Sequence, residues 1–463
     1  MTKSAPPVGR VSRRLMLPLV VPVLSFAAGP RLGAQAPPAT RVAKGRHVDL
    51  DSAGDVWIGF SGQLRTRAES WTNFNFGTPA TANANDTFVL NRVLLGADLH
   101  AGHHVRVFVQ GKSSTSSDRA LLGGRRVTDV DEADVQQAFG ELDASRLAGG
   151  TLSVRVGRQD ITLGRERLVS TADWANTRRT FQGALGSITT ATASLTALWA
   201  RPVLVEKYAL NSADSATSIY GLYATQRLQA LDAGLDAYWL RLERDGAAFN
   251  GTTGHEARHT LGARVWGPLR PSAGFDFDAE GAGQFGTIAD TKRIHAAFFA
   301  GQLGYNVPRW RASRFYLGAD YGSGDGAPGG NVGTFNALFP NPHGYLGFID
   351  VIGRQNALDL SAGASTTRLW AALTGQVDVH RFTRASASDG IYNKLGAPLA
   401  RTGTLSRLPT GVGTELDLTL RYPVDQYLLL SSGASAFWPG PFIEQSGPSR
   451  TIGFLYVAGQ YTL

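Results

Sequence analysis

Cysteine is absent from the 463-residue sequence, and charged residues make up only 18% of it. The absence of cysteine excludes a disulfide framework, a thiolate metal site and a cysteine nucleophile. Soluble proteins carry about 25% charged residues on average. Because 10% of the residues are aromatic, the low charge does not indicate a disordered chain.

Lysine is also scarce: it occurs at six positions, so 39 of the 45 basic residues are arginine. Arginine binds carboxylates and phosphates as a planar fork and stays charged when partly buried, although a GC-rich genome would produce the same bias. The net charge of +8 does not indicate a nucleic-acid partner, because residues 1–36 contribute five basic and no acidic side chains. The remainder is nearly balanced, with 40 basic and 37 acidic residues.

Long apolar runs are missing beyond the N-terminus, so no transmembrane helix is predicted there. Lys3 to Arg14 form a basic segment, residues 15–28 form an apolar one, and Ala34 to Ala36 resemble a cleavage site. This order predicts a signal peptide over residues 1–36. Residues 37–55 are then a periplasmic N-terminal linker.

The rest of the chain alternates apolar and polar residues along extended stretches. In 368–380, Leu373 and Val377 share one phase, whereas Asp378 and His380 occupy the other. Such alternation places the two sets on opposite faces of a sheet. A soluble sandwich would show the same pattern, so the loop lengths have to decide between the two.

We expect eighteen strands, at residues 56–71, 86–101, 104–114, 131–142, 151–160, 180–187, 190–200, 217–227, 230–243, 257–267, 274–286, 294–305, 313–321, 357–365, 367–381, 412–422, 426–437 and 451–463. The connections after even-numbered strands are short, as at Thr366, and most others are long, as at 244–256 and 322–356. This asymmetry is typical of outer-membrane barrels with short periplasmic turns and long extracellular loops. An open sheet edge is not tolerated in lipid, so the sheet must close. The predicted fold class is therefore all-β, a single transmembrane antiparallel β-barrel over residues 56–463 with a lumen wide enough for an aqueous channel.

Three blocks resemble the bacterial alginate export family of outer-membrane porins: Gly157–Gly183, Gly322–Asn356 with its TFNALFP and YLGFID runs, and Glu415–Leu463 with its WPGPFIEQSGPS stretch. The resemblance covers most of residues 56–463. It implies a monomeric eighteen-stranded barrel in the outer membrane of a Gram-negative-type bacterium, with an arginine-rich lumen that an anionic uronate polymer crosses. Lipid, lipopolysaccharide and the barrel-assembly machinery are the partners that this location implies. Assembly signals usually end in an aromatic residue, whereas this chain ends in Leu463.

Arginine is the residue type that points most directly to function. Arginines fall on the polar phase of many predicted strands, and a lumen that passes carboxylates requires fixed cations on its wall. The residues selected to set an anion preference are Arg65, Arg67, Arg158, Arg178 and Arg179, with Arg354 and Arg368 as weaker candidates. The spacing places Arg65 and Arg67 on one wall, and Arg158, Arg178 and Arg179 at one mouth. The alternative is that these arginines are structural ion pairs.

Acidic residues on the polar phases are predicted to pair with these arginines and hold them in place. They are Asp276, Asp278, Glu280, Glu415 and Asp417. Such pairing would also weaken static trapping of an anionic solute.

The loop over 322–356 is long enough to fold inward, and its residues 334–339 are too apolar to extend into water. We expect this run to pack on the lumen wall or to cap the mouth. Asp320 and Asp325 flank an oxygen-rich turn that could hold Ca²⁺, but the spacing is not that of an EF-hand and turn chemistry explains it as well. No other metal or cofactor is predicted.

Two other motifs match enzyme signatures. His255 to His259 read H-E-x-x-H, but in a strand the two histidines would be about 13 Å apart, too far to share one zinc ion. Residues 281–286 read G-x-G-x-x-G, but the strand before them carries acidic residues and is not buried on both faces, as a dinucleotide site requires.

The predicted function is passive, selective passage of anionic saccharides, such as an alginate-like polysaccharide or its fragments, or of small anions, without covalent chemistry. A general diffusion porin for small solutes is the alternative in the same class. An outer-membrane barrel hydrolase is the alternative of another class. We find no serine, histidine and acid set on neighbouring predicted strands to support it.

Overall fold

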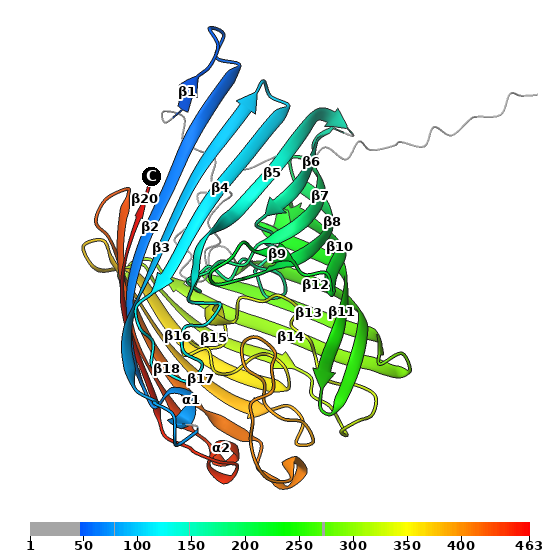
Figure 1. Ribbon diagram of the computed structural model, residues 1–463, viewed down its shortest axis with the longest axis vertical. Coiled ribbons are helices and arrows are strands. Elements are labelled where there is room, and N and C mark those ends of the chain that lie inside the picture. Colours follow the sequence, from blue (N-terminus) through cyan, green and yellow to red (C-terminus); the bar gives the residue numbers. More distant parts are fainter. Residues whose placement is uncertain (1–46, 78, 148, 271–273) are drawn as a thin grey trace, which may run out of the picture.

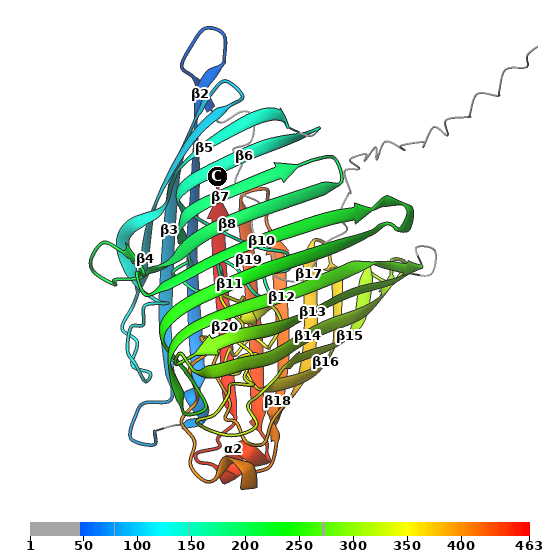
Figure 2. The ribbon, with the colours of Figure 1, turned by 90° about the vertical axis from the view of Figure 1, so that its right-hand side faces the viewer.

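The computed structural model describes residues 47–77, 79–147, 149–270 and 274–463. The predicted signal peptide and residues 37–46 of the predicted linker lie outside the described residues. The described chain forms one antiparallel sheet that closes on itself (Figures 1 and 2).

Eighteen strands form the barrel wall in the described residues, at the predicted places. They are β2 (Val56–Thr72), β3 (Asp86–Ala101), β4 (Val105–Ser116), β5 (Asp131–Leu147), β6 (Gly150–Gln159), β7 (Phe181–Thr189), β8 (Ala193–Leu204), β10 (Thr217–Leu228), β11 (Ala233–Phe249), β12 (Thr252–Arg270), β13 (Phe275–Ile288), β14 (Lys292–Val307), β15 (Ser313–Gly322), β16 (Ala357–Trp370), β17 (Leu373–Arg384), β18 (Gly411–Pro423), β19 (Leu428–Pro439) and β20 (Ile452–Thr462). Two short strands, β1 (His47–Asp49) and β9 (Ser212–Ala213), pair with β2 and β8. Each wall strand pairs antiparallel with the next, and β20 pairs with β2 to close the barrel.

The two ends of the barrel differ, as the sequence predicts. One end carries the short turns, β1 and the C-terminus, and we call it the short-turn end (Figure 1). The other, the long-loop end, carries α1 (Phe74–Gly77) and α2 (Pro441–Gln445). Short 3₁₀ turns lie at Gln229–Leu231, between β10 and β11, and within loops at Pro342–Gly344 and Leu405–Arg407. Among the described residues no helix has the length and hydropathy needed to cross a membrane.

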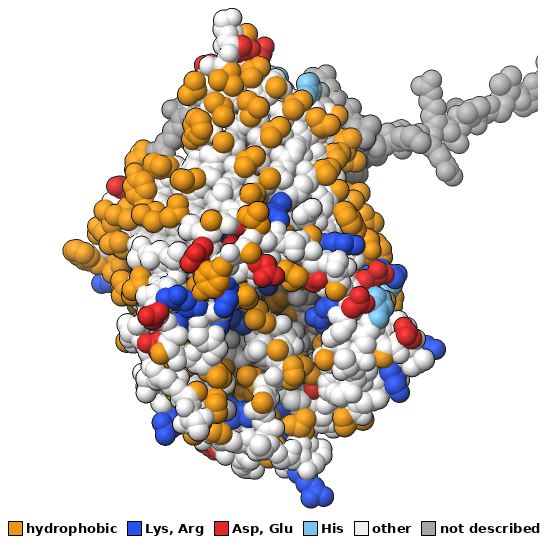
Figure 3. Space-filling model, in the orientation of Figure 1, with side chains coloured by type: hydrophobic (Ala, Val, Ile, Leu, Met, Phe, Trp, Pro, Cys, Tyr) orange, Lys and Arg blue, Asp and Glu red, His pale blue; other side chains and the backbone are white. Residues whose placement is uncertain are grey.

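The two faces of the wall have opposite chemistry. The outer face exposes apolar side chains, with Leu95, Leu317 and Val457 each about two-thirds exposed at 64–65%. Figure 3 shows hydrophobic side chains gathered over β2–β6, with charged side chains toward the loops. The inner face buries charged residues such as Arg92 and Asp98, both 1% exposed. A wall that is apolar outside and polar inside suits a barrel in lipid around a polar lumen.

The predicted loop over 244–256 is wrong. β11 and β12 continue through it as a hairpin whose turn is Asn250-Gly251, both with positive φ. An Asn-Gly pair is the strongest short-range signal for such a turn. The small and polar composition of the segment concealed this, although Ala247 and Phe249 alternate inward and are buried. The predicted turn at Thr366 is also displaced, because β16 runs on to Trp370.

Inward-folded loops fill much of the lumen. Phe335, in the loop 323–356, is fully buried and stacks on Phe298 of β14 with ring centroids 5.1 Å apart. Ala337 is buried in the same cluster, together with Val169 from the loop 160–180. The prediction that the apolar run of the longest loop packs on the lumen wall is confirmed.

Candidate permeation pathway

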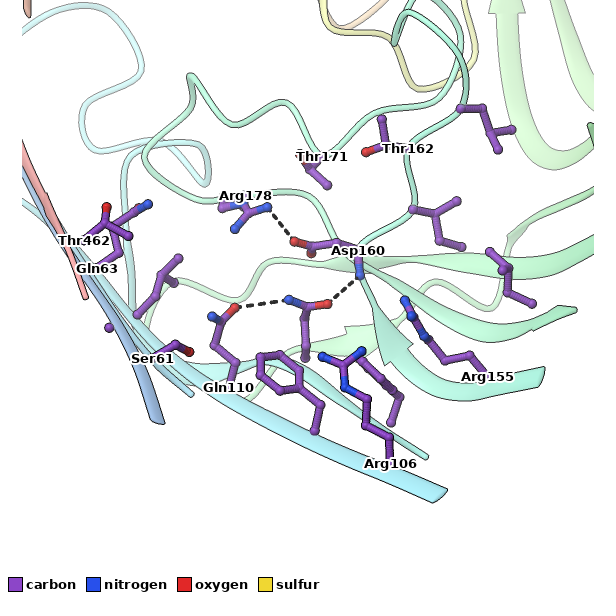
Figure 4. A pocket seen from close by; sticks show the side chains of 18 of the residues that line it. Ser61, Gln63, Arg106, Gln110, Arg155, Asp160, Thr162, Thr171, Arg178 and Thr462 are labelled. Carbon is purple, nitrogen blue, oxygen red and sulfur yellow. Dashed lines mark hydrogen bonds and ion pairs between the residues drawn. The ribbon is translucent and has the colours of Figure 1, made fainter. Parts of the chain in front are cut away.

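Two loop segments divide the lumen, and we call them together the partition: residues 171–178 and 343–349. On the short-turn side lies the inner cavity, of about 370 Å³, whose lining includes Arg106, Gln110, Arg155, Asp160, Thr171 and Arg178 (Figure 4). On the long-loop side lies the outer cavity, of about 280 Å³, whose lining includes Arg67, Arg126, Trp174, Phe348, Val351 and Lys394. Thr171 and Arg178 of the partition line the inner cavity, and Trp174 and Phe348 line the outer one.

Three wall arginines hold the first segment of the partition by its backbone. Arg65 donates from Nη1 and Nη2 to the carbonyls of Asp173 and Ala175, both at 2.8 Å. Arg67 donates to the carbonyl of Trp174 at 2.7 Å, and Arg92 donates to that of Asp173 at 3.1 Å. The prediction that Arg65 and Arg67 share the inward face is confirmed. Arg65 directs both terminal nitrogens to the loop, whereas Arg67 directs Nη1 to the loop and its other two nitrogens to Glu69.

Trp174 is enclosed on both faces. The Arg67 guanidinium lies 3.9 Å from the ring centroid, and the His343 ring stacks on the indole with centroids 4.0 Å apart. Phe348 approaches both rings edge-on. His343 is paired with Asp350, which also accepts a hydrogen bond from Lys394 at 2.8 Å. Trp174 and His343 therefore join the two segments of the partition.

Arg178 points into the inner cavity and is held from two sides. It contacts Asp160 at 2.6 Å and Asp173 at 3.0 Å, and Figure 4 shows it turned toward Asp160. Burial alone would raise the pKa of Asp173, but the charges of Arg92 and Arg178 outweigh it and lower that pKa. The carboxylate thus stays ionised and fixes both arginines.

Arg106 and Arg155 complete the cationic side of the inner cavity. Arg106 donates to Asp98 through two nitrogens at 2.8 and 3.0 Å, and both arginines contact Glu141. Their positions on the polar phase of β4 and β6 follow from the alternation of the sequence. They are better placed to meet a solute than several of the residues selected from the sequence.

Arg179 and Arg354 anchor loops rather than line a cavity. Arg179 has no carboxylate partner among the described residues and donates to the carbonyls of Ser170, Phe339 and Pro340 at 2.7 to 3.2 Å. Burial lowers the pKa of Arg179 to about 10, so it remains charged at neutral pH. Arg354 binds Asp320 through two nitrogens, at 2.7 and 2.8 Å.

Arg158 and Arg368 lie apart from this group. Arg158 contacts Asp134 at 3.2 Å and the carbonyl of Asn211 at 2.9 Å. Arg368 is exposed near the end of β16, beside the short turn. Arg158, Arg178 and Arg179, which were expected at one mouth, are each directed to a different set of partners.

The acidic residues divide into two sets. Asp276 pairs with Arg314, and both Asp278 and Glu280 pair with Arg167, as expected of acids beside lumenal arginines. The expected pairing with arginine fails for Glu415 and Asp417.

Glu415 and Asp417 meet no arginine among the described residues. Glu415 instead accepts the backbone N–H of Ile349 at 2.8 Å, and Asp417 lies 4.0 Å from His380. Gly347, with φ of +80°, passes so close to Glu415 that a side chain there would collide with the carboxylate. These acids hold the second segment of the partition, which fills the space that an arginine would need.

The candidate calcium ligands are already paired. Asp320 binds Arg354, and Asp325 accepts the N–H groups of Gly326 and Gly333 at 2.8 and 3.2 Å. Within the described ranges no group of three or more His, Asp or Glu side chains could hold a metal ion.

The two enzyme-like motifs both lie in strands. H-E-x-x-H falls within β12, where Glu256 and Arg258 are buried inward. G-x-G-x-x-G falls within β13, paired on both sides by β12 and β14. Neither motif therefore has the helix that its chemistry requires.

The sequence matches the model of the alginate export family over residues 56–454. The chain belongs to this family. Together with the closed, outwardly apolar barrel, this places the alginate export family member in the outer membrane of a Gram-negative-type bacterium. Its short-turn end then faces the periplasm and its long-loop end the exterior. No curated protein sequence matches the chain.

Several solved structures share the fold of this alginate export family member. The outer membrane protein OpdK of Pseudomonas aeruginosa matches with a TM-score of 0.59 at 12% identity, over 87% of this chain and 98% of OpdK. OccAB2 of Acinetobacter baumannii matches with a TM-score of 0.59 at 10% identity, over 87% and 98% of the two chains. OccK2 (OpdF) of P. aeruginosa, solved in complex with glucuronate, matches with a TM-score of 0.56 at 13% identity, over 88% and 98%. Sequence identities this low show only that the folds are similar.

Proposed function

We propose that the protein is a passive channel for anionic solutes, with small carboxylates and acidic saccharide fragments as its cargo and no covalent chemistry. The main support for this proposal is the charge of the side chains that line the inner cavity. Its lining holds three guanidinium groups, from Arg106, Arg155 and Arg178, and one carboxylate side chain, from Asp160. The other carboxylates that pair with these arginines, Asp98, Glu141 and Asp173, are not part of the lining. Fixed cations on a pore wall favour anions.

Arg178 is the principal selectivity residue in this proposal, because it lies on the partition itself. Arg65 and Arg67 act mainly by positioning residues 173–175, and their charge adds to the same field. Arg158, Arg179, Arg354 and Arg368 contribute little, since they are directed away from the inner cavity or already bound to loop atoms.

The size of the passage favours fragments over a long polymer. The partition is fixed at both segments by buried contacts, and the two cavities measure about 370 and 280 Å³. Cavities near this size accommodate single small molecules. Glucuronate and vanillate, named with the related folds OccK2 and OpdK, are small carboxylates and support the same choice.

One observation favours a general diffusion porin as the second candidate. A smaller recess on the opposite wall carries equal numbers of cations and carboxylates: Arg165, Arg167 and Arg314 against Asp320, Asp359 and Asp378. A mixed wall of this kind would pass small solutes of either charge.

Ion-current measurements in planar bilayers separate the two candidates. Under a salt gradient, the anion channel should give a reversal potential that corresponds to chloride over potassium, and the general porin one near zero. Turnover of lipid or polysaccharide by the purified protein would contradict both and favour a barrel enzyme.

A further inference from the structure

The outer cavity has a different chemistry from the inner one. Much of its lining is apolar and only partly buried, including Phe74, Val351 and Leu399. Leu395 at its rim is 64% exposed. Apolar side chains left accessible in a concave site are a binding surface for an apolar group.

The charges of the outer cavity cancel in pairs. Arg126 binds Asp129 through two nitrogens at 2.8 Å, and Lys394 binds Asp350 at 2.8 Å. Arg67 is likewise paired with Glu69. The net side-chain charge of the lining is therefore zero, whereas the lining of the inner cavity contains three arginines and one carboxylate side chain. Long-range attraction of anions does not explain what this cavity would hold.

Two cations at its edge nevertheless retain free donors. The side chain of Arg126 is 33% exposed and that of Lys394 is 24% exposed. Asp129 occupies Nε and Nη2 of Arg126, and among the described residues Nη1 makes no hydrogen bond. Lysine has three donors, of which Asp350 takes one. Both side chains line the cavity, so a carboxylate bound there would have unused donors in the lining, while the body of the molecule lay against the apolar side chains.

We infer that the outer cavity is a binding site for carboxylates carried on an apolar ring or chain, which enter from outside the cell. The cavity's 280 Å³ suits one small molecule. The inference deepens the proposed function and rests on it, because the bound solute would then pass the partition to the cationic inner cavity. It adds a requirement that charge alone does not impose, namely an apolar body.

The test compares solutes of matched charge on the full-length protein in planar bilayers. Benzoate and cyclohexanecarboxylate should block the chloride current at concentrations roughly tenfold below those needed for acetate or glucuronate, since burial of two methylene groups is worth about that factor. Benzyl alcohol, which has the ring without the charge, should block more weakly than benzoate. Equal block by all four carboxylates would overturn the inference.

Two variants locate the site. Val351→Ser should weaken block by benzoate and cyclohexanecarboxylate at least several-fold and leave block by acetate unchanged. Lys394→Gln should raise the concentration of benzoate needed for block to nearly that of benzyl alcohol. Lys292→Gln, at the same end of the barrel but outside the cavity, should change the blocking concentration of neither solute. Unaltered benzoate block in both cavity variants would place binding elsewhere and overturn the inference.

The controls keep the inference separate from the proposed function. Each variant should insert and conduct chloride, which shows that the barrel is folded, and Lys292→Gln should also keep the parent's reversal potential. Absence of anion preference in the parent would contradict the proposed function. Anion preference without discrimination between benzoate and acetate would contradict the inference alone.

Discussion

Arg67 holds both the side chain and the backbone of Trp174. Its guanidinium carbon lies 3.9 Å from the indole centroid, and its Nη1 donates to the Trp174 carbonyl at 2.7 Å. A single strand residue therefore fixes the position and the orientation of the bulkiest side chain in the partition. We therefore expect this pair to set the width of the passage.

Arg67→Lys should loosen the partition while keeping the charge. Lysine offers a point charge on a flexible stem and lacks the planar fork that stacks and donates together. We expect anion preference close to the parent's, with a larger and noisier single-channel current. Arg241→Lys, on the outer face of β11, is the matched control and should behave as the parent. A single-channel current identical to the parent's would show that Arg67 does not set the width.

Arg178→Gln should lower the ratio of chloride to potassium permeability. One charge about 4 Å away is worth about 1 kcal/mol in water, or up to about fivefold. The difference should fade as salt rises, because screening acts over about 8 Å at physiological ionic strength. Reversal potentials at low and high salt measure it, with Arg241→Gln as the control. An unchanged ratio at low salt would remove Arg178 from the selectivity site.

Arg179→Ala should destabilise the protein more than it changes selectivity. The variant leaves the carbonyls of Ser170, Phe339 and Pro340 without their donor, and each buried unpaired group costs about 1–3 kcal/mol. We expect a lower urea midpoint and a larger conductance, because this residue links the two inward loops. If the midpoint stayed at the parent value, the loops would be held by other contacts.

Acid should open the partition. Burial lowers the pKa of His343, as do Lys394 and Arg67, while Asp350 opposes them. A group with a depressed pKa stabilises the folded arrangement fully above its ordinary pKa, near 6.5 for histidine, and loses that contribution as pH falls below it. Conductance should therefore rise as the pH is lowered from 7.5 to 5.5. The conductance of His343→Gln should not change over this window. A parent channel without the rise would show that His343 does not control the partition.

Chain length should limit what crosses. The fixed partition predicts that mono- and disaccharide uronates permeate proteoliposomes and that long oligomers are excluded. Release of radiolabelled oligouronates of graded length measures the limit. Passage of polymer at the rate of the monosaccharide would show that the partition moves aside in the membrane.

The alternation of the sequence was enough to predict the wall but not the partners of its side chains. Period two fixes which face Arg65 and Glu415 occupy, because successive side chains point to opposite sides. It does not state what fills the lumen opposite them. Glu415 faces a loop backbone, and Arg65 binds carbonyls about a hundred residues away in sequence.

The hairpin between β11 and β12 shows a different limit. The Asn250-Gly251 pair is typical of a tight turn, but the small and polar residues around it led to the prediction of a long loop. The roles of Trp174 and His343 had no local signal at all, since their contact joins two loops far apart in the chain. Tertiary contacts of this kind follow from the fold and not from spacing.

The pairing of β2 with β20 has a consequence for biogenesis. The first and last wall strands meet, as in Arg65 opposite Gln460, so the seam cannot form until the entire polypeptide has been synthesised. Contacts between such distant parts of a chain make folding slow. Any truncation before β20 would leave two unpaired edges, so a partly translated or clipped chain would be a substrate for proteolysis or aggregation and not a narrower pore.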